Sequence, residues 1–212
     1  MNQAQADANA TAQVGELVRR ARAAQQVADG YDQTRVDELV AAAGWAIMEP
    51  ARNRALAELA VASTGIGNVA DKIAKNQRKT LGLLRDLKGA KSVGVIAEHA
   101  ATGIVEIARP VGVVCAVTPS TNPGATPANK IINALKGRNA VIVAPSPKGW
   151  ATAATLIEYI HAQFDRIGAP RDLVQLLAAP VTKQSTLELM RQCDLVVATG
   201  SQANVRAAYA SG

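Results

Sequence analysis

The sequence predicts an α/β protein in which N-terminal helices and a β-hairpin precede part of a doubly wound parallel sheet. Two observations carry this prediction. Residues 14–89 repeat their apolar positions at helical spacing. After Pro110 the pattern changes to short apolar runs separated by helical segments, and strands that are apolar on both faces belong to parallel sheets covered by helices. With 212 residues, 49% of them hydrophobic, the chain can form a sizeable core.

The first two helices are expected between Val14 and Pro50. The first carries apolar residues at helical spacing from Val14 and ends at Asp29-Gly30. Thr34 with Asp37 resembles a capping start for the second helix. Residues 1–13 are polar and rich in Ala, Asn and Gln, so we expect them to form a disordered tail.

Two further helices are expected before the pattern changes. Pro50 suits the first turn of a helix, where its missing N–H is not needed, and that helix stops at Thr64-Gly65. Asn68 is suited to cap a fourth helix that ends before Gly89. Residues 92–109 then hold two short segments rich in Val and Ile around a turn at residues 100–103, which predicts a β-hairpin ended by Pro110.

The segment from Val111 alternates strands and helices. Its apolar runs predict strands at residues 111–117, 140–144 and 195–198, with a weaker strand at 173–177. The segments between them predict helices at residues 127–135, 150–167 and 185–191, and another helix starts near Ser201. This alternation predicts a parallel sheet with helices on both faces.

Composition excludes several classes of protein. Aromatic residues are only 3% of the chain, which does not favour stacking on nucleic acid bases. There is no secretory signal, no apolar stretch long enough for a membrane span, and the two cysteines form no disulfide framework, so a soluble cytoplasmic protein is expected. The net charge of +6 is spread along helices, which leaves open solvated faces or a surface for nucleotide or coenzyme A phosphates.

Ligands of doubly wound sheets sit at the carboxyl ends of the strands, so the loops after the apolar runs are the candidate site. The first of these loops, Thr118-Pro119-Ser120-Thr121-Asn122-Pro123-Gly124, is held extended by its prolines. Asn122 could donate hydrogen bonds to a reacting carbonyl oxygen as an oxyanion donor. It could equally close the turn by bonding its own backbone, and spacing alone favours this second interpretation.

Two more loops follow later strands. After residues 140–144 come Pro145, Ser146 and Lys148, where Ser146 could meet a ribose hydroxyl and Lys148 a phosphate, or the prolines could simply stiffen a helix-capping turn. After the last run, Thr199-Gly200-Ser201 leads from a strand into a helix start. Unpaired N–H groups and the helix dipole favour a phosphate there, although a lone Gly at such a turn is common.

The cysteines and histidines show no catalytic pattern. Cys115 falls inside a predicted buried strand, where a thiol behaves as an inert apolar group. Cys193 precedes a strand, at the end of the sheet away from the ligand side. His99 and His161 lack partners at useful spacing, and no metal site is expected.

Taken together, these segments resemble the aldehyde dehydrogenase superfamily, and most closely its coenzyme-A-acylating branch. That branch includes the acetaldehyde dehydrogenase half of bifunctional aldehyde-alcohol dehydrogenases, and within it the sequence looks most like bacterial sulfoacetaldehyde dehydrogenases. The short motifs that carry the resemblance occur in the same order and at similar spacing as in the family. They are Ser63–Asn68, Ala108–Val114, Pro119–Pro123, Leu135–Ala140, Ala144–Pro147 and Ala198–Gly200.

The resemblance implies an enzyme that oxidises a small aldehyde with NAD or NADP and passes the acyl group from a cysteine thiolate to coenzyme A. It implies that Asn122 is the oxyanion donor, which reverses the preference from spacing. It also implies a dinucleotide-binding domain at 111–212, with cofactor contacts from three loops. The expected cofactor residues are Thr118, Pro119, Ser120, Thr121, Ala144, Pro145, Ser146, Lys148, Thr199, Gly200 and Ser201.

The chain also departs from the family pattern. Hydrolytic members carry a Lys and often a Glu in the ribose turn, where this chain has Ala144 and Pro147, so NAD versus NADP stays open. Family members are much longer, and neither Cys115 nor Cys193 aligns with the catalytic cysteine. The resemblance therefore implies that this chain is the N-terminal portion of such an enzyme and is inactive alone. It also implies that residues 14–110 form a helical segment plus an oligomerisation hairpin.

Two functions follow as expectations. The first is part of an acylating aldehyde dehydrogenase that acts as a homo-oligomer through the hairpin at 92–109. The alternative is a non-catalytic nucleotide-binding or assembly module, because an unpaired hairpin edge is a template for association. Neither nucleic acid nor a membrane is expected as a partner.

Overall fold

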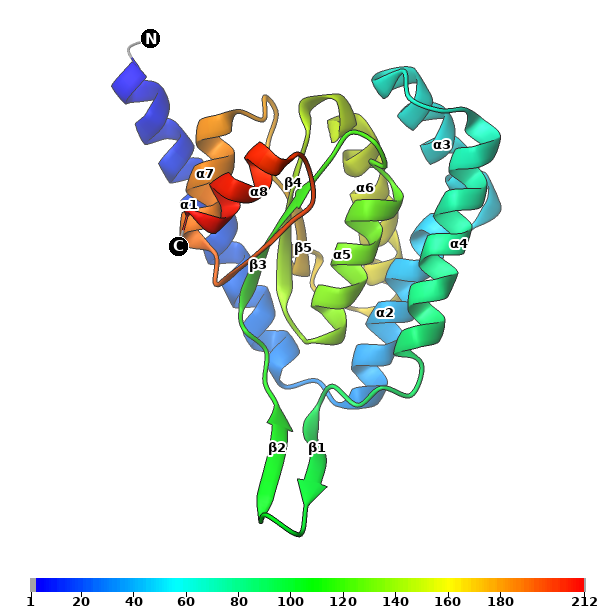
Figure 1. The fold of residues 1–212 in the computed structure, drawn as a ribbon, viewed down its shortest axis with the longest axis vertical. Helices are drawn as coiled ribbons and strands as arrows, with labels where there is room; N and C mark the ends of the chain where they lie inside the picture. The colour runs from blue at the N-terminus through cyan, green and yellow to red at the C-terminus, as the bar shows by residue number, and fades with distance from the viewer. Residues whose placement is uncertain (1–2, 212) are drawn as a thin grey trace.

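The centre of the molecule is a parallel sheet of four strands, ordered β5-β4-β3-β6, with helices on both faces (Figure 1). The computed structural model describes residues 3–211. From β3 the chain adds β4 and then β5 on one side, and it returns to add β6 on the other side of β3. This reversal confirms the predicted doubly wound α/β fold. The strands are β3 (Val113–Thr118), β4 (Ala140–Pro145), β5 (Val174–Leu176) and β6 (Leu195–Ala198).

Two helical layers cover the sheet (Figure 1). One face is covered by α1 and α7, and the other by α5 and α6, with α2 packed on both of these and α3 and α4 outside it. No helix within residues 3–211 is long and apolar enough to span a bilayer. The helices are α1 (Gln3–Asp29), α2 (Gln33–Met48), α3 (Pro50–Thr64), α4 (Val69–Leu87), α5 (Ala125–Lys136), α6 (Trp150–Ile167), α7 (Lys183–Gln192) and α8 (Gln202–Tyr209).

The helices before Pro110 and the sheet after it share one hydrophobic core. Polar contacts join the same two segments: Lys136 Nζ pairs with Asp37 Oδ1 at 2.5 Å, and an Arg138 guanidinium nitrogen donates to the Asp29 carbonyl at 2.6 Å. The change of sequence pattern near Pro110 therefore marks a change of local structure, and the buried core continues across it.

The starts of α1 and α2 differ from those predicted. Helix α1 begins at Gln3, so the expected tail at 1–13 is wrong from that residue onward, because Ala and Gln are good helix formers that extend the helix. Helix α2 is capped by Asp32, whose carboxylate accepts the Arg35 N–H at 2.8 Å. Thr34 is therefore not the cap, and Asp37 pairs with Lys136 instead.

The remaining caps follow the prediction. Pro50 begins α3, and Gly65 ends it in the left-handed conformation at φ 67°. The side chain of Asn68 caps α4 by accepting the Asp71 N–H at 2.9 Å. Helices α5 and α7 each begin two residues earlier than their apolar pattern suggested.

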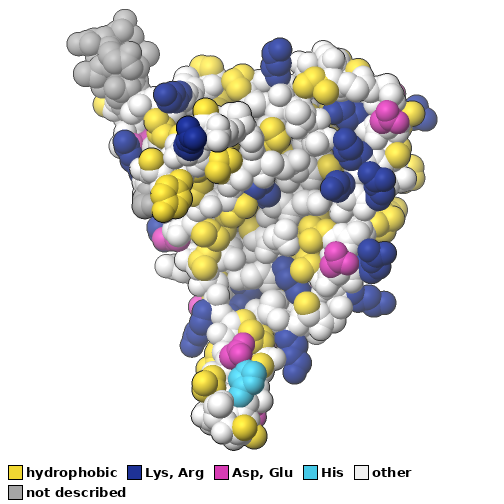
Figure 2. All heavy atoms as spheres, in the orientation of Figure 1, with side chains coloured by type: hydrophobic (Ala, Val, Ile, Leu, Met, Phe, Trp, Pro, Cys, Tyr) yellow, Lys and Arg dark blue, Asp and Glu magenta, His cyan; other side chains and the backbone are white. Residues whose placement is uncertain are grey.

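The hairpin projects away from the sheet and its helices (Figure 1). Strands β1 (Gly94–His99) and β2 (Ile104–Ala108) pair antiparallel, as predicted. Hydrophobic side chains gather on this hairpin at the bottom of Figure 2. Val95, Ile104, Val105 and Ile107 are each 44–56% exposed, so the hairpin buries few of its apolar side chains within the described chain.

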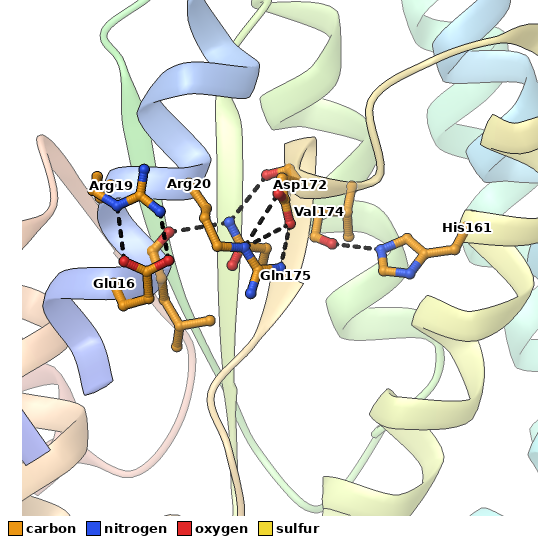
Figure 3. Close-up of polar contacts among 8 residues, drawn as sticks. Glu16, Arg19, Arg20, His161, Asp172, Val174 and Gln175 are labelled. Carbon is orange, nitrogen blue, oxygen red and sulfur yellow. Dashed lines mark hydrogen bonds and ion pairs between the residues drawn. The ribbon is translucent and has the colours of Figure 1, made fainter. Parts of the chain in front are cut away.

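The edge strand β5 is held from both faces of the sheet (Figure 3). The side-chain amide of Gln175 donates to the carbonyl oxygen of Leu17 on α1 at 3.1 Å. Arg20 of α1 pairs with Asp172, just before the strand. From the opposite layer, His161 of α6 bonds the carbonyl oxygen of Val174 at 2.8 Å. These contacts give His161 a structural role.

Asp194 joins the start of β6 to β3. Its carboxylate accepts the Val113 N–H at 2.7 Å and pairs with Arg22 of α1 at 2.8 Å. Gly112 passes so close that a Cβ there would lie 2.3 Å from a carboxylate oxygen of Asp194. Burial tends to raise the pKa of Asp194, but the hydrogen bonds from Arg22 and Val113 outweigh it and the pKa is lowered.

Candidate functional site

A cavity of about 930 Å³ opens at the carboxyl ends of β3, β4 and β6. Its position is the point where the strand order reverses, between β3 and β6, and ligands of doubly wound sheets bind at such points. The loops that form it are tied to β3 by backbone hydrogen bonds. The Ser146 N–H donates to the Thr118 carbonyl at 2.9 Å, and the Thr199 N–H donates to the Val117 carbonyl at 3.1 Å.

The structure brings together most of the residues that were predicted from the sequence to contact a cofactor. Three groups line the cavity, each at the carboxyl end of a different strand. They are Thr118, Pro119, Ser120 and Thr121 at the end of β3, Ala144, Pro145 and Ser146 at the end of β4, and Thr199, Gly200 and Ser201 after β6.

Lys148 is the exception. It lies in the middle of the short 3-10 turn Pro147–Gly149, is exposed, and does not line the cavity. The cause is the packing of Gly149, which is buried so tightly that a Cβ there would lie 3.0 Å from Pro123 Cβ. The turn therefore has Gly149 on its buried side and Lys148 on its solvent side.

The first turn of α7 also lines the cavity, which was not predicted from the sequence. Thr182, Lys183 and Thr186 line the wall formed by this helix. The Thr182 hydroxyl oxygen caps α7 by accepting the Ser185 N–H at 3.0 Å, and the Ser185 hydroxyl oxygen accepts the Thr182 N–H at 3.0 Å. A Thr just before a helix is a recognisable capping signal, whereas the apolar period of this helix begins too late to show its start.

The cavity suits an anionic ligand. Two helix N-termini, of α7 at Thr182 and of α8 at Ser201, contribute to its lining, and their unpaired N–H groups and dipoles favour negative charge. Among residues 3–211, the lining contains one charged side chain, the cation Lys183, and no carboxylate. Basic residues of α1, by contrast, pair with acids: Arg20 with Asp172 and Arg22 with Asp194.

Polar groups in the lining are available to a ligand. The Oγ of Ser146 is buried and has no hydrogen-bond partner within residues 3–211. A polar atom buried without a partner is costly, so it marks a position where a ligand or water would complete the bonding. Gly200 lies close to the first turn of α8, since a Cβ there would lie 3.1 Å from the Asn204 amide nitrogen.

Asn122 lies in the same loop as Thr118–Thr121 but outside the cavity lining. Its backbone carbonyl accepts the Thr126 N–H at 3.2 Å, in the first turn of α5. Its side-chain oxygen is buried and accepts no hydrogen bond from the described residues. A turn closed by the side chain would require that oxygen to accept a backbone N–H, so the structure does not support the turn-closing interpretation.

Neither cysteine is placed for nucleophilic chemistry at this cavity. Cys115 is fully buried in β3, and Cys193 ends α7 at the opposite end of the sheet. A hydrogen bond with Cys115, together with burial, raises the pKa of the Cys193 thiol far above its usual range. Because the thiolate is the reactive form, Cys193 is inert at neutral pH.

Residues 2–211 match the aldehyde dehydrogenase family. The chain belongs to this family. It is 69% identical over 209 residues to the acylating sulfoacetaldehyde dehydrogenase of Cupriavidus necator. The matched residues are 99% of this chain and 42% of that protein. The acylating sulfoacetaldehyde dehydrogenase of Bilophila wadsworthia is 47% identical and is covered over 43% of its length. The chain therefore spans less than half the length of these relatives, and the resemblance to the acylating branch is confirmed.

Solved structures agree with the fold. An acetylating aldehyde dehydrogenase from Geobacillus thermoglucosidasius has a TM-score of 0.91 at 35% identity, covering 97% of this chain and 45% of that one. The propionaldehyde dehydrogenase of Rhodopseudomonas palustris, with bound CoA and an acylated cysteine, has a TM-score of 0.81 at 27% identity, covering 94% and 45%. An engineered glycolyl-CoA reductase with bound NADP+ has a TM-score of 0.81 at 26% identity, covering 94% and 45%.

Proposed function

We propose that this chain forms most of the dinucleotide site and supplies the oxyanion donor of an NAD(P)-dependent, CoA-acylating aldehyde dehydrogenase. The observation that carries the proposal is the cavity at the strand-order reversal, which combines two helix N-termini with a lining free of carboxylates. The substrate is a small aldehyde, with sulfoacetaldehyde favoured by the 69% identical relative. The nucleophilic cysteine belongs to residues outside this chain.

The residues present fit a dinucleotide. Thr199, Gly200 and Ser201 would hold the diphosphate at the start of α8, and the unpartnered Ser146 hydroxyl would meet the adenosine ribose. When bound, the oxidised nicotinamide supplies the hydride acceptor of the reaction. The absence of an acidic group from the lining leaves room for a 2′-phosphate, with Lys183 as the cation to meet it.

Asn122 would act on the aldehyde. When a thiolate attacks the carbonyl carbon, its oxygen gains negative charge, and an amide N–H aimed at that oxygen stabilises the developing charge. Asn122 suits this role because its backbone is held by α5 while its side chain is not engaged in closing the turn.

Titration of the 212-residue chain with NAD+ and NADP+ tests the cavity. We expect one site for each dinucleotide, and Gly200→Val should weaken both by about tenfold or more, which is about 1.4 kcal/mol, because the added side chain fills the phosphate turn. Lys183→Gln should weaken the binding of NADP+ selectively, by up to about fivefold, as expected for the charge pair of an exposed lysine.

Lys148→Gln is the matched control, since this exposed lysine follows the same strand as Ser146 but lies outside the cavity. Its affinity for both dinucleotides should equal that of the unaltered chain. A folded chain that binds neither dinucleotide would remove the basis of the proposal.

A second candidate function is assembly, favoured by the apolar side chains exposed on β1 and β2. We propose that the hairpin of one copy associates with another copy, since an exposed apolar hairpin is a template for pairing. The chain alone should self-associate, and Ile107→Lys, at a residue 56% exposed, should shift its mass in solution toward the monomer. An unaltered chain that is already monomeric would contradict this.

A further inference from the structure

Lys72 of α4 is a buried cation that contacts the loop carrying Asn122. Its side chain donates from Nζ to the carbonyl oxygen of Thr121 at 2.6 Å, and the residue is only 7% exposed. Gly67 lies against the stem of the side chain, where a Cβ would be 3.5 Å from Lys72 Cε. No carboxylate of the described chain lies within ion-pairing distance of this ammonium group.

This arrangement is unfavourable for stability alone. An ammonium group loses its hydration when it is buried, and lysine is rarely buried without an acidic partner. Burial, together with the charge of Lys75, lowers the pKa of Lys72. A methionine of similar length would fill the same space without that cost. The position of the cation therefore points to a role in the loop it contacts.

The contact holds one of the two peptide groups that flank the Asn122 Cα. Lys72 bonds the carbonyl of the Thr121–Asn122 peptide, and the Thr126 N–H bonds the Asn122 carbonyl of the next peptide at 3.2 Å. With both peptide planes held, the φ and ψ angles of Asn122 are set, and its side chain starts from a fixed Cα. Loss of the Lys72 bond would release the first of these planes.

The next turn of α4 provides a firm base for this contact. Asn76 is 5% exposed, and its amide donates to Asn53 Oδ1 of α3 at 2.9 Å. The amide of Asn53 in turn donates to the carbonyl of Ile73 at 3.2 Å. Asn76 also lies beneath the residue before α5, since a Cβ at Gly124 would be 3.4 Å from its side-chain oxygen. Helix α4 therefore supports the loop at both ends of the Thr121–Gly124 segment.

We propose that Lys72 is the positioning residue of Asn122: it fixes the Thr121–Asn122 peptide so that the Asn122 amide is aimed at the reacting carbonyl oxygen. This inference rests on the proposed function, which makes Asn122 the oxyanion donor. Lys72 acts through the loop backbone and does not itself touch the substrate. Its contribution is therefore to kcat, while the dinucleotide and aldehyde bind as before.

The test is a double-mutant cycle between Lys72→Met and Asn122→Ala. The assay protein is this chain continued through the length that its relatives have beyond it, taken from its own reading frame or from the Cupriavidus necator relative. We expect Lys72→Met to lower kcat by about tenfold to a hundredfold, the size of effect that a displaced catalytic group produces. The KM values for aldehyde and dinucleotide should change by less than about twofold, because ground-state binding is unaltered.

In the Asn122→Ala background, Lys72→Met should have no further effect, because a residue that acts through another contributes nothing once that other is absent. Lys79→Met is the matched control: Lys79 is an exposed lysine of the same helix, and its replacement should leave kcat unchanged. Thermal unfolding of each variant accompanies the kinetics. Should Lys72→Met not fold, Lys72→Gln takes its place in the cycle.

The outcomes separate this inference from the proposed function. Undiminished turnover in Asn122→Ala overturns the oxyanion role, and the positioning role with it. A strong loss in Asn122→Ala beside normal kcat in Lys72→Met overturns the positioning role alone. Losses that multiply in the double variant also overturn it, since Lys72 would then act independently of Asn122.

Discussion

Strands β4 and β6 have similar compositions and different surroundings. The first, Ala140–Pro145, is buried at every position, whereas the second, Leu195–Ala198, alternates between exposed and half-buried residues. Strand β4 lies between β3 and β5, while β6 has a strand neighbour on one side within residues 3–211. An apolar run thus predicts that a strand forms, but its neighbours in the fold decide whether it is covered.

The largest expected effect lies in the covered strand. Ile142 of β4 is fully buried, so Ile142→Ala should lower the free energy of unfolding by about 2–5 kcal/mol, through lost burial and the cavity left behind. Urea unfolding followed by circular dichroism measures it. A loss below about 1 kcal/mol, the range of exposed sites, would mean that β4 is not at the centre of the core.

An intermediate effect is expected at Asp194, which joins the start of β6 to β3. Its carboxylate bonds the β3 backbone and Arg22, so Asp194→Asn should cost about 1.5–3 kcal/mol, the range for hydrogen bonds to a charged group. Because the folded-state pKa of Asp194 is lowered, its contribution is present above the unfolded pKa and is lost as pH falls through the folded value.

The unaltered chain should therefore lose stability at acid pH more steeply than the Asp194→Asn variant. Urea midpoints measured from neutral pH down to about pH 3, below the usual pKa of Asp, compare the two. Parallel curves would show that the carboxylate is not stabilised in the fold.

The smallest effect is expected in the partly covered strand. Leu195 is 43% exposed, so Leu195→Ala should change the free energy of unfolding by less than about 1 kcal/mol, as exposed sites do. Measured beside Ile142→Ala in the same buffer, it quantifies the contrast between the two strands. An equal loss at both positions would show that β6 is as well covered as β4.

Local signals predicted much of this structure. Continuous apolar runs located β3, β4 and β6. Strands β3 and β4 are buried at every position, and a strand buried on both faces has no polar positions to interrupt its apolar run. Turn chemistry placed Pro50, Gly65 and Asn68 at helix ends, since each residue has a specific backbone preference. The loops after the strands were placed at the cavity because the sheet topology puts them there.

Long-range contacts escaped prediction because their partners are distant in sequence. The orientation of Lys148 depends on the packing of Gly149 against Pro123, which no local pattern encodes. The sequence does not distinguish Lys72 from the other basic residues of its helix, because its partner is a backbone carbonyl 49 residues away. The core that spans Pro110 likewise depends on contacts between segments whose patterns look independent.

The most direct test of the proposed function is the reduction of NAD(P)+ by the assay protein, with aldehyde and coenzyme A supplied together or one at a time. We predict turnover that yields acyl-CoA and needs both substrates, and a loss in kcat of about 10²–10³ in Asn122→Ala, the usual cost of removing one oxyanion donor. Reduction that proceeds without coenzyme A to a free acid, or turnover undiminished in Asn122→Ala, would contradict the account.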